Sequence, residues 1–558
     1  MENKFVKFLI ITDSDVTSKF LNVLSSFLPS GNRAVTVDSV SSINNVNDDN
    51  QAYNQCPNNE NNNKLTDNVF LDVWQFNSRA AEPVEGKIEQ AVMKINPNND
   101  QIGFAFVNGS FWTSMADKDN SYRTWMTSKD FCTSTSFVYD QDGNTYGVMA
   151  GGDSGDMADK YNFITSRWGV SGAGDRPSDG SGNRSRDGTN ALRLEELCDN
   201  TYSDGAFAKQ RFMSSSLAVS TKTNGTNVYL AYYDSLYSQI RFRYGRLNSD
   251  TKTNFGNFQD ACTQTGSWSS YATARQYAQI LATGSEKVST DDIAGAKSGE
   301  YVSIGVVNNN GNDTVVAVWY DSVNYKMWYA YNTSPTTNRE NGVRKDNDTS
   351  DGWSNPVEVF TGEAATAGSY CKVAVDGNGG VHIAAFDITN NNVVYAMLPA
   401  GNKGVATQTS DFTTCLVDGN SPAGDYLTLD VALDANDKAI PYIGYYSSGC
   451  IHPKMAYAVT SSTNAGTDSN GFMTGDWEIT VVPTPKKVET QSNQHNPINI
   501  GVWKDGSGKL KQNPSSGTST LIGTTASGMS GKIYGNGTSN PVLGYVITDD
   551  TIETAQKK

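Results

Sequence analysis

The acidic segment KDNDTSDG (345–352) carries the clearest metal-binding spacing in this 558-residue chain. Its carboxylates belong to Asp346, Asp348 and Asp351, and such oxygens bind Ca²⁺ in acidic loops. Two departures weaken the match. The glycine occupies the seventh loop position, where an EF-type loop has it at the sixth, and Val357 stands where a bidentate glutamate is needed. We therefore predict an acidic turn and no cofactor, with Ca²⁺ as a weakly supported alternative.

The three histidines, His382, His452 and His495, belong to no H-E-x-x-H pair of the kind that binds catalytic zinc. His382 stands in the run VHIAAFD, which predicts a strand residue. The chain also has no P-loop, no G-x-S-x-G and no dinucleotide-binding glycine pattern. No recognised motif therefore assigns a catalytic residue.

Three tryptophans are the aromatic candidates for contact with a ligand. Trp112, Trp125 and Trp268 lie near expected loops and outside the regular strand pattern. Rings placed there stay accessible, whereas rings within a doubly covered strand are buried. We name them as ligand-binding candidates.

Composition restricts the partner and the fold class. The chain is 37% hydrophobic and 18% charged, too poor in charged helix-formers for a helical bundle. No apolar run approaches the roughly 18 residues of a membrane-spanning helix. The net charge of −16 repels phosphate backbones, so we expect no nucleic-acid partner.

The N-terminal region is predicted to lie outside the folded domain. Residues 1–64 contain a short apolar run that could form a helix and that is cut short for a signal peptide, followed by an Asn-rich linker at 41–64. Residues 65–558 form the second unit. The sequence in this unit repeats itself, so one supersecondary element is expected to recur along it.

Each repeat predicts a three-stranded meander. An alternating strand meets a Gly/Asn turn, a second apolar strand ends in aromatic-Asp, and a third strand carries alternating aromatics. The clearest copies are 216–245, 303–332 and 372–398, with looser copies at 90–116, 133–169 and 427–458, and a last copy split between 498–513 and 532–556.

Additional strands complete the predicted blades. The segments WSNPVEVF (353–360) and WEITVV (477–482) follow two copies as fourth strands, and VFLDVWQF (69–76) is predicted to complete the last blade. The expected fold is an all-β, seven-bladed β-propeller of four-stranded antiparallel blades. Six blades, and less favourably an array of β-sandwiches, are the alternatives.

Two long insertions interrupt the repeats, at 170–211 and 246–299. Insertions on a rigid ring commonly carry recognition. The second contains TARQYAQILATG (273–284), which we predict as a short helix.

The aspartate that ends each second strand recurs at Asp234, Asp321 and Asp387. Because a catalytic site draws different residues from different repeats, a recurring residue indicates a structural role, here a bond to its own turn. The neighbouring aromatics are predicted to pack between blades. They are Tyr232, Tyr233, Trp319, Tyr320, Phe386, Tyr445 and Tyr446.

The units VYLAYYDSLYSQIRFRYG, TVVAVWYDSVNYKMWYAYN and VHIAAFDITNNNVVYAML resemble blades of the sialidase-like, BNR-type propellers of large exported or cell-surface bacterial proteins. The resemblance covers roughly residues 69–555 and implies an extracellular or cell-surface location. Propellers of this type include sialidases, other glycosidases, lectins and adhesive modules, so the resemblance implies a fold but does not select an activity. No S-x-D-x-G-x-T-W box is present. The catalytic residues of sialidases are therefore assigned to no position.

A sialidase-type site would require arginines that bind a carboxylate, and Arg167 and Arg211 lie on or near expected blade strands. We name both as ligand-binding candidates. The predicted function is non-catalytic binding of a glycan, or of a surface or matrix protein, through loops on one face. A sialidase-type glycoside hydrolase with diverged motifs and a structural role at a cell surface are the alternatives.

Overall fold

The computed structural model describes a large part of the chain after residue 73. The described residues are 74–80, 90–107, 111–116, 122–127, 132–143, 145–152, 160–168, 192–196, 200–201, 212–222, 225–234, 239–247, 279–283, 298–335, 353–419, 423–447, 452–458, 466–467, 473–474, 477–482, 497–511, 514, 540–548 and 551–557. Predictions for 1–64 and for most of the two insertions lie outside these residues.

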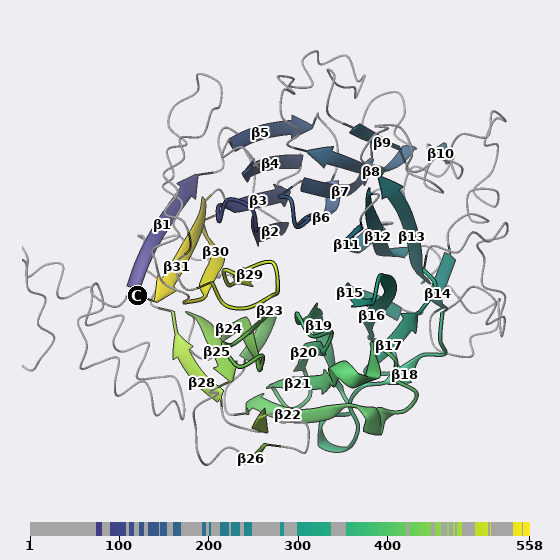
Figure 1. The fold of residues 1–558 in the computed structure, drawn as a ribbon, viewed down its shortest axis with the longest axis vertical. Coiled ribbons are helices and arrows are strands. Elements are labelled where there is room, and N and C mark those ends of the chain that lie inside the picture. Colours follow the sequence, from purple (N-terminus) through teal and green to yellow (C-terminus); the bar gives the residue numbers. More distant parts are fainter. Residues whose placement is uncertain are drawn as a thin grey trace, which may run out of the picture.

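The described chain is all-β, apart from three short 3₁₀ helices, η5 (Gly362–Ala364), η6 (Ala400–Asn402) and η7 (Thr409–Asp411). Its strands form seven antiparallel sheets of four or five strands and one two-stranded sheet. In each large sheet, the strand nearest the centre in Figure 1 is called the inner strand.

The first four sheets follow one another along the chain. The first sheet consists of β2 (Gln90–Ile95), β3 (Ile102–Val107), β4 (Phe111–Ala116) and β5 (Tyr122–Thr127), and the second of β6 (Cys132–Tyr139), β7 (Thr145–Gly152) and β8 (Lys160–Trp168), with β9 (Leu192–Glu196) and β10 (Asn200–Thr201) both paired to β8. The third sheet consists of β11 (Phe212–Lys222), β12 (Gly225–Asp234), β13 (Gln239–Leu247) and β14 (Gln279–Thr283). The fourth consists of β15 (Ser298–Asn309), β16 (Asn312–Asp321), β17 (Lys326–Asn332) and β18 (Val357–Glu358).

Three further large sheets complete the set. They consist of β19 (Ala367–Val375), β20 (Val381–Asp387), β21 (Asn392–Leu398) and β22 (Thr413–Asp418); β23 (Ala423–Leu433), β24 (Ala439–Ser447), β25 (His452–Ala458) and β28 (Trp477–Val481); and β29 (Pro497–Gly501), β30 (Val542–Thr548), β31 (Thr551–Lys557) and β1 (Trp74–Ala80). The small sheet pairs β26 (Gly466–Thr467) with β27 (Met473–Thr474).

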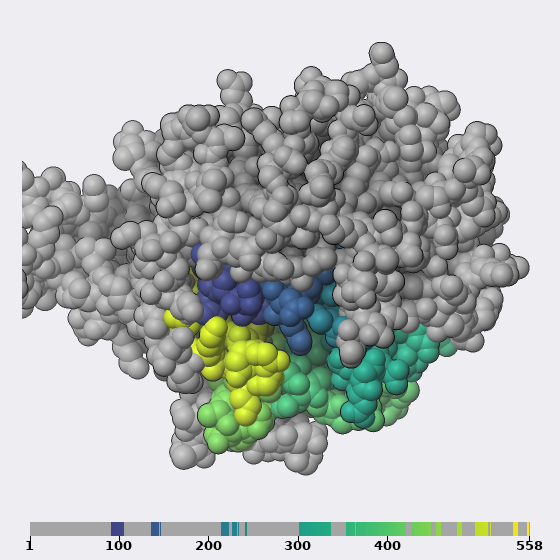
Figure 2. Space-filling view, turned by 45° about the horizontal axis from the view of Figure 1, so that its top comes forward, coloured from purple at the N-terminus to yellow at the C-terminus, as the bar shows by residue number. Residues whose placement is uncertain are grey.

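The sheets are arranged radially, and their inner strands form a ring around the centre (Figure 1). Each inner strand contacts the next along the chain, and β2 contacts both β6 and β29. Figure 2 shows the purple residues around β2 beside the yellow residues around β29, although about 400 residues separate them in sequence. Radial sheets with short edges are the arrangement of a β-propeller.

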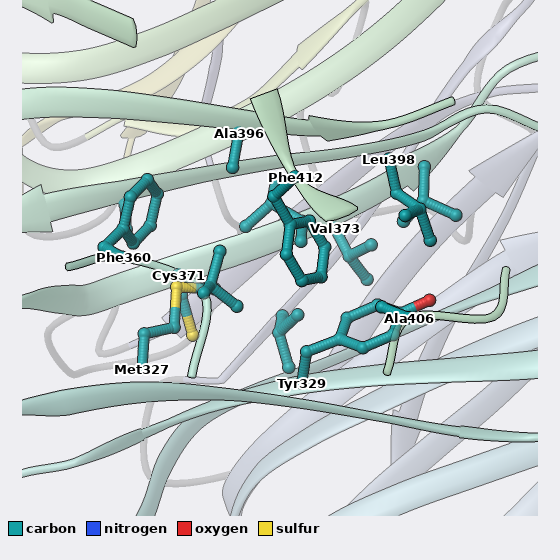
Figure 3. Packing of buried hydrophobic residues seen from close by; sticks show 14 of the residues in the cluster. Met327, Tyr329, Phe360, Cys371, Val373, Ala396, Leu398, Ala406 and Phe412 are labelled. Atoms are coloured by element: carbon teal, nitrogen blue, oxygen red, sulfur yellow. The ribbon is translucent and has the colours of Figure 1, made fainter. Parts of the chain in front are cut away.

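The core lies between the faces of neighbouring sheets. In Figure 3, Met327 and Tyr329 of β17 face Cys371 and Val373 of β19, and Phe412 closes the cluster. Second strands are covered on both faces, so β16 is buried at every position after its first. This explains why second strands are continuous apolar runs without a period of two.

Strand β1 pairs with β31 in an antiparallel register from Trp74↔Lys557 to Ala80↔Thr551. An N-terminal strand thus completes the sheet formed by the C-terminal strands. The sequence predicted this pairing for 69–76, and its described part begins at Trp74. The two predicted fourth strands also form, since β28 pairs with β25 and β18 pairs with β17.

The helix predicted within TARQYAQILATG is wrong for its described part, because Gln279–Thr283 form strand β14. This strand pairs with β13 from Gln239↔Thr283 to Phe242↔Gln279. The open edge of β13 offers backbone partners that an isolated turn of helix lacks, so tertiary pairing overrides the local helix propensity.

The recurring aspartates bind their own turns, as predicted, at both positions whose side chains are described. Asp321 Oδ1 accepts hydrogen bonds from the backbone N–H of Val323 (3.0 Å) and of Asn324 (3.1 Å). Asp387 Oδ1 accepts from the N–H of Thr389 at 3.1 Å, and its Oδ2 from the Asn390 amide at 2.8 Å. Both aspartates are fully buried. The predicted interblade aromatics are buried as well, with the side chain of Tyr232 outside the description. The buried members are Tyr233, Trp319, Tyr320, Phe386, Tyr445 and Tyr446.

Candidate functional site

Four consecutive inner strands contain a β-bulge at the same place. The register shifts within β11, β15, β19 and β23. Each bulge holds one non-glycine residue in the left-handed region, an uncommon conformation that costs about 1–2 kcal/mol. These residues are Ser214 (φ 56°), Tyr301 (φ 57°), Tyr370 (φ 54°) and Tyr426 (φ 54°). Strained backbone that recurs at one position of a ring marks that position as a candidate site.

The three tyrosines of this set contact one another across the sheets. The ring centroids of Tyr301 and Tyr370 are 4.5 Å apart, and those of Tyr370 and Tyr426 are 5.3 Å apart, with planes tilted by 37° and 39°. All three rings are partly exposed. We call Tyr301, Tyr370 and Tyr426 the tyrosine arc. It contrasts with Tyr329 and Tyr395 of the third strands, which are fully buried.

The tyrosine arc lies on the edge of the ring where the inner strands begin. Each of its members is the fourth residue of its strand. The turns from second to third strands reach this same edge, because Asp387 pairs with Ala367 at the start of β19. Those turns expose three apolar side chains, Val323 (45%), Tyr325 (52%) and Ile388 (50%). Aromatic and apolar groups thus gather on one edge of the ring, the arc edge.

Charged side chains converge within the inner ring from four consecutive strands. Lys372 lies on β19 and Asp430 on β23, Lys504 follows β29, and Lys94 lies on β2. Lys504 Nζ donates to Asp430 Oδ1 at 2.5 Å and to the carbonyl of Val431 at 3.1 Å. We call the three lysines and Asp430 the inner charge cluster.

The inner charge cluster perturbs its own lysines. Burial lowers the pKa of Lys94 below its usual 10.5. Asp430 opposes this shift by stabilising the charged form, whereas Lys504 and Lys372 add to it by repulsion. Burial also lowers the pKa of Lys372. The four charges are therefore close enough to act on one site.

Lys372 occupies a position that otherwise joins neighbouring sheets. The first paired residue after the bulge usually accepts a hydrogen bond from a backbone N–H of the next inner strand. The pairs are Ser216 with Ile304 (3.1 Å), Ser303 with Val373 (3.1 Å), Thr428 with Ile500 (3.2 Å) and Asn499 with Met93 (2.8 Å). A lysine ammonium cannot accept such a bond. The sequence therefore departs from the structural pattern at β19 and places a cation there.

A row of acid, histidine and tyrosine lies at the opposite edge. His382 Nε2 lies 2.9 Å from Asp376 Oδ2, and His382 Nδ1 lies 2.5 Å from the Tyr395 hydroxyl. His382 is fully buried in β20, which confirms the strand predicted for it. Burial raises the pKa of Tyr395 well above 10. These groups satisfy one another's hydrogen bonds around the buried imidazole of His382.

The structure describes the backbone of three of the five residues predicted to contact a ligand, and all three lie in strands. Trp112 lies in β4 opposite Phe106 and Met126, and Trp125 lies in β5. Arg167 lies in the third strand β8. These are third and fourth strands, outside the inner ring, and their side chains are not described. Trp268, Arg211 and the acidic residues Asp346, Asp348 and Asp351 lie outside the described residues.

Sequence reasoning missed the tyrosine arc, although a signal was present. The strings EYVS, SYCK and DYLT each place a tyrosine two residues before a polar residue. These strings stand at the starts of three of the copies, at 300–303, 369–372 and 425–428. The predicted copies begin one or two residues after each tyrosine, at 303, 372 and 427, and so leave the tyrosines outside the repeat.

Comparisons with known proteins give weak likenesses. No family model and no curated protein matches this chain. Among solved structures, AofleA from Arthrobotrys oligospora is 9% identical at a TM-score of 0.35, with 74% of this chain and 91% of that chain covered. The six-bladed fucose-recognising lectin of Aleuria aurantia is 8% identical at 0.33, with 73% and 99% covered. The GH93 α-L-arabinofuranosidase of Fusarium graminearum is 8% identical at 0.35, with 76% and 92% covered. Similarity at this level assigns no function.

Two further observations apply only to the described residues. None of their helices is long and apolar enough to cross a membrane. They contain no group of three or more His, Cys, Asp or Glu side chains arranged to hold a metal ion.

Proposed function

We propose that this chain is a seven-bladed β-propeller that binds a glycan, without catalysis, through the arc edge of its ring. The seven large sheets supply the blades, and the pairing of β1 with β31 joins the two ends of the domain. An exported or cell-surface location accompanies this proposal as a prediction of the family resemblance.

The observation that carries the proposal is the tyrosine arc. Its rings come from three consecutive sheets, lie 4.5 and 5.3 Å from their neighbours and keep part of their surface exposed. An amphipathic ring with an accessible face and a hydroxyl suits a ligand that is apolar on one side and polar on the other. The C–H faces and hydroxyls of a sugar have this character.

The backbone beneath the arc supports a binding role. Positive φ at Tyr301, Tyr370 and Tyr426 is unfavourable for a tyrosine, and glycine would adopt it freely. The fold therefore holds three aromatic rings at positions where local stability favours glycine. Strain of this kind commonly accompanies function.

The non-catalytic interpretation is favoured over a sialidase-type hydrolase by the carboxylates near the inner charge cluster. Most glycoside hydrolases need two carboxyl groups facing one bond, whereas a sialidase-type site needs a tyrosine nucleophile with a carboxylate partner and a separate carboxylic acid. Asp430 is the one described carboxylate that acts on Lys94, and it already binds Lys504 and the backbone N–H of Val502 at 3.1 Å.

The test combines a glycan array with a fluorogenic sialoside assay on the intact chain. We expect binding without turnover, and roughly tenfold weaker binding in Tyr370→Ala, equivalent to about 1.4 kcal/mol. Tyr331→Ala is the control, because Tyr331 is a partly exposed tyrosine near the end of β17 that lies away from the arc edge. Unchanged affinity in Tyr370→Ala would refute the arc as the site, and turnover of the sialoside would refute the non-catalytic assignment.

A further inference from the structure

The charge of the inner charge cluster is opposite to that of the chain. The whole sequence carries a net charge of −16. The inner charge cluster combines three lysines with one aspartate, which leaves a net charge of +2 when all four are ionised. The cluster is therefore cationic in a chain with an excess of acidic residues, although the inner strands β15 and β23 also carry Glu300 and Asp425, whose side chains are not described.

Two of the three lysines form no ion pair with a described side chain. Lys504 is held by Asp430 and by the carbonyl of Val431. No ion pair of the described side chains includes Lys94 or Lys372, whereas Lys222, Lys454, Lys509 and Lys511 each pair with an aspartate. Partly buried cations that repel one another are unfavourable until an anion joins them.

The position of Lys372 connects this charge to the tyrosine arc. Lys372 stands two residues after Tyr370 and is the first paired residue after the bulge. Its neighbours in the ring carry Ser303 and Thr428 at the same position, and both of these bind the next sheet. Because lysine gives up that bond, the residue at this position serves something other than the joining of sheets.

We propose that the inner ring binds an oxyanion, a sulfate ester or a carboxylate of an acidic saccharide, through Lys94 and Lys372. Lys504, fixed by Asp430, supplies the third positive charge. The inference rests on the proposed function in one respect, namely that the tyrosine arc holds the sugar to which the anionic group belongs. Ammonium groups recognise such oxygens as point charges with three donors each.

The first experiment measures binding of matched oligosaccharides to the intact chain at low ionic strength. One ligand carries sulfate esters, a second carries carboxylates, and a third is neutral with the same chain length. We expect the preferred acidic ligand to bind at least tenfold more tightly than the neutral one, and the order of the two acidic ligands identifies the source of the oxyanion. Equal affinity for all three would overturn the oxyanion inference.

Substitutions test which lysines cause the tighter binding of the acidic ligand. Lys94→Gln and Lys372→Gln are expected to weaken the acidic ligand about fivefold to tenfold each and to leave the neutral ligand unchanged. Lys438→Gln is the matched control, because Lys438 is exposed on a turn outside the cluster. Neither inner variant should unfold the protein, since each removes one of several like charges. If the control weakens acidic binding as much as the inner variants do, the attraction is a general surface effect and the site is wrong.

A second readout separates failure of this inference from failure of the proposed function. Sodium sulfate at constant ionic strength should raise the midpoint of thermal unfolding of the wild type more than that of the Lys94→Gln, Lys372→Gln double variant. Loss of this difference would overturn the oxyanion site even if glycans bind. Retention of it without binding of any oligosaccharide would support the anion site and overturn the glycan-binding proposal.

Discussion

The strained tyrosine at the centre of the arc predicts a reversal of the usual order of alanine and glycine. Replacing Tyr370 removes two ring contacts in either variant, a loss of about 0.5–1.5 kcal/mol per pair. The variants then differ only in backbone. Alanine retains the left-handed conformation at φ 54° and its cost of about 1–2 kcal/mol, whereas glycine does not. Glycine in turn loses about 0.5–1 kcal/mol through the entropy of the unfolded chain.

The balance predicts that Tyr370→Gly is more stable than Tyr370→Ala by about 0.5–1 kcal/mol. Equilibrium urea unfolding, followed by tryptophan fluorescence, measures this as a difference in midpoint at a common slope. Val373 provides the control, because it lies in the same strand and has no positive φ. There, alanine should be more stable than glycine by about 0.5–1 kcal/mol.

The refuting result is a pair of equal midpoints at Tyr370, or a higher midpoint for alanine. Either would mean that the bulge relaxes when the ring is removed and that the fold does not impose the left-handed conformation. The fold would then not hold the tyrosines of the arc against the preference of their backbone for negative φ, although the ring contacts of the wild type would remain.

The remaining predictions concern buried aspartates. Asp313 accepts hydrogen bonds from four side chains, including Lys222 of the neighbouring sheet, so Asp313→Asn should lower the free energy of unfolding by about 3–5 kcal/mol. The control is Asp437→Asn at an exposed position, which should change the free energy of unfolding by about 0.5 kcal/mol or less. Equal effects of the two substitutions would contradict the stabilising role of Asp313. Burial raises the pKa of Asp313, but the four hydrogen bonds outweigh it and hold this pKa below 3.8. The stabilisation is therefore present above pH 3.8 and lost as the pH falls through the folded pKa, and a difference between wild type and Asp313→Asn that stays constant in acid would exclude this linkage. Asp387→Ala removes the acceptor for the N–H groups of its own turn and should lower the free energy of unfolding, measured in urea, by about 1–3 kcal/mol. Asp387→Asn keeps one acceptor oxygen and should lower it less. Equal decreases for the two variants would argue against a stabilising bond to the turn.

The repeat was visible in the sequence because second strands are buried on both faces. Runs such as TVVAVWYD and VHIAAFD carry apolar side chains on both faces of a strand, so they require a covered position within the fold, and both form continuous buried strands. The segment QILAT was harder to predict, because its strand exists only through the open edge of β13. Local propensity cannot show such an edge.

The candidate site was invisible for a different reason. Lys94 and Lys504 are 410 positions apart, so their proximity depends on β2 meeting β29 in the ring. The sign of φ at Tyr370 depends on a bulge, and tyrosine gives no hint of positive φ in a sequence. Prediction reached the strands and their order, whereas the site arises from irregularities in those strands and from the meeting of distant ones.

The two edges of the inner ring differ in the aromatic side chains that they present, and this difference favours one edge for a ligand. At the far edge, Asp376, Asp434 and Asp505 bind backbone N–H groups of their own turns, at 2.7–3.0 Å. Burial raises the pKa of Asp376, but its hydrogen bond with His382, together with the backbone bonds, holds this pKa below 3.8. The hydrogen bond from the Ser507 hydroxyl is the main cause that holds the pKa of Asp505 below 3.8. Carboxylates occupied in this way keep their negative charge and cannot reorganise around a ligand. At the arc edge Asp321 and Asp387 bind their own turns in the same way, but this edge adds the partly exposed rings of the tyrosine arc, with Lys372 two residues after Tyr370. We therefore propose the arc edge for a ligand that is apolar on one face and anionic at one group. The acidity of the chain as a whole therefore does not describe the inner charge cluster.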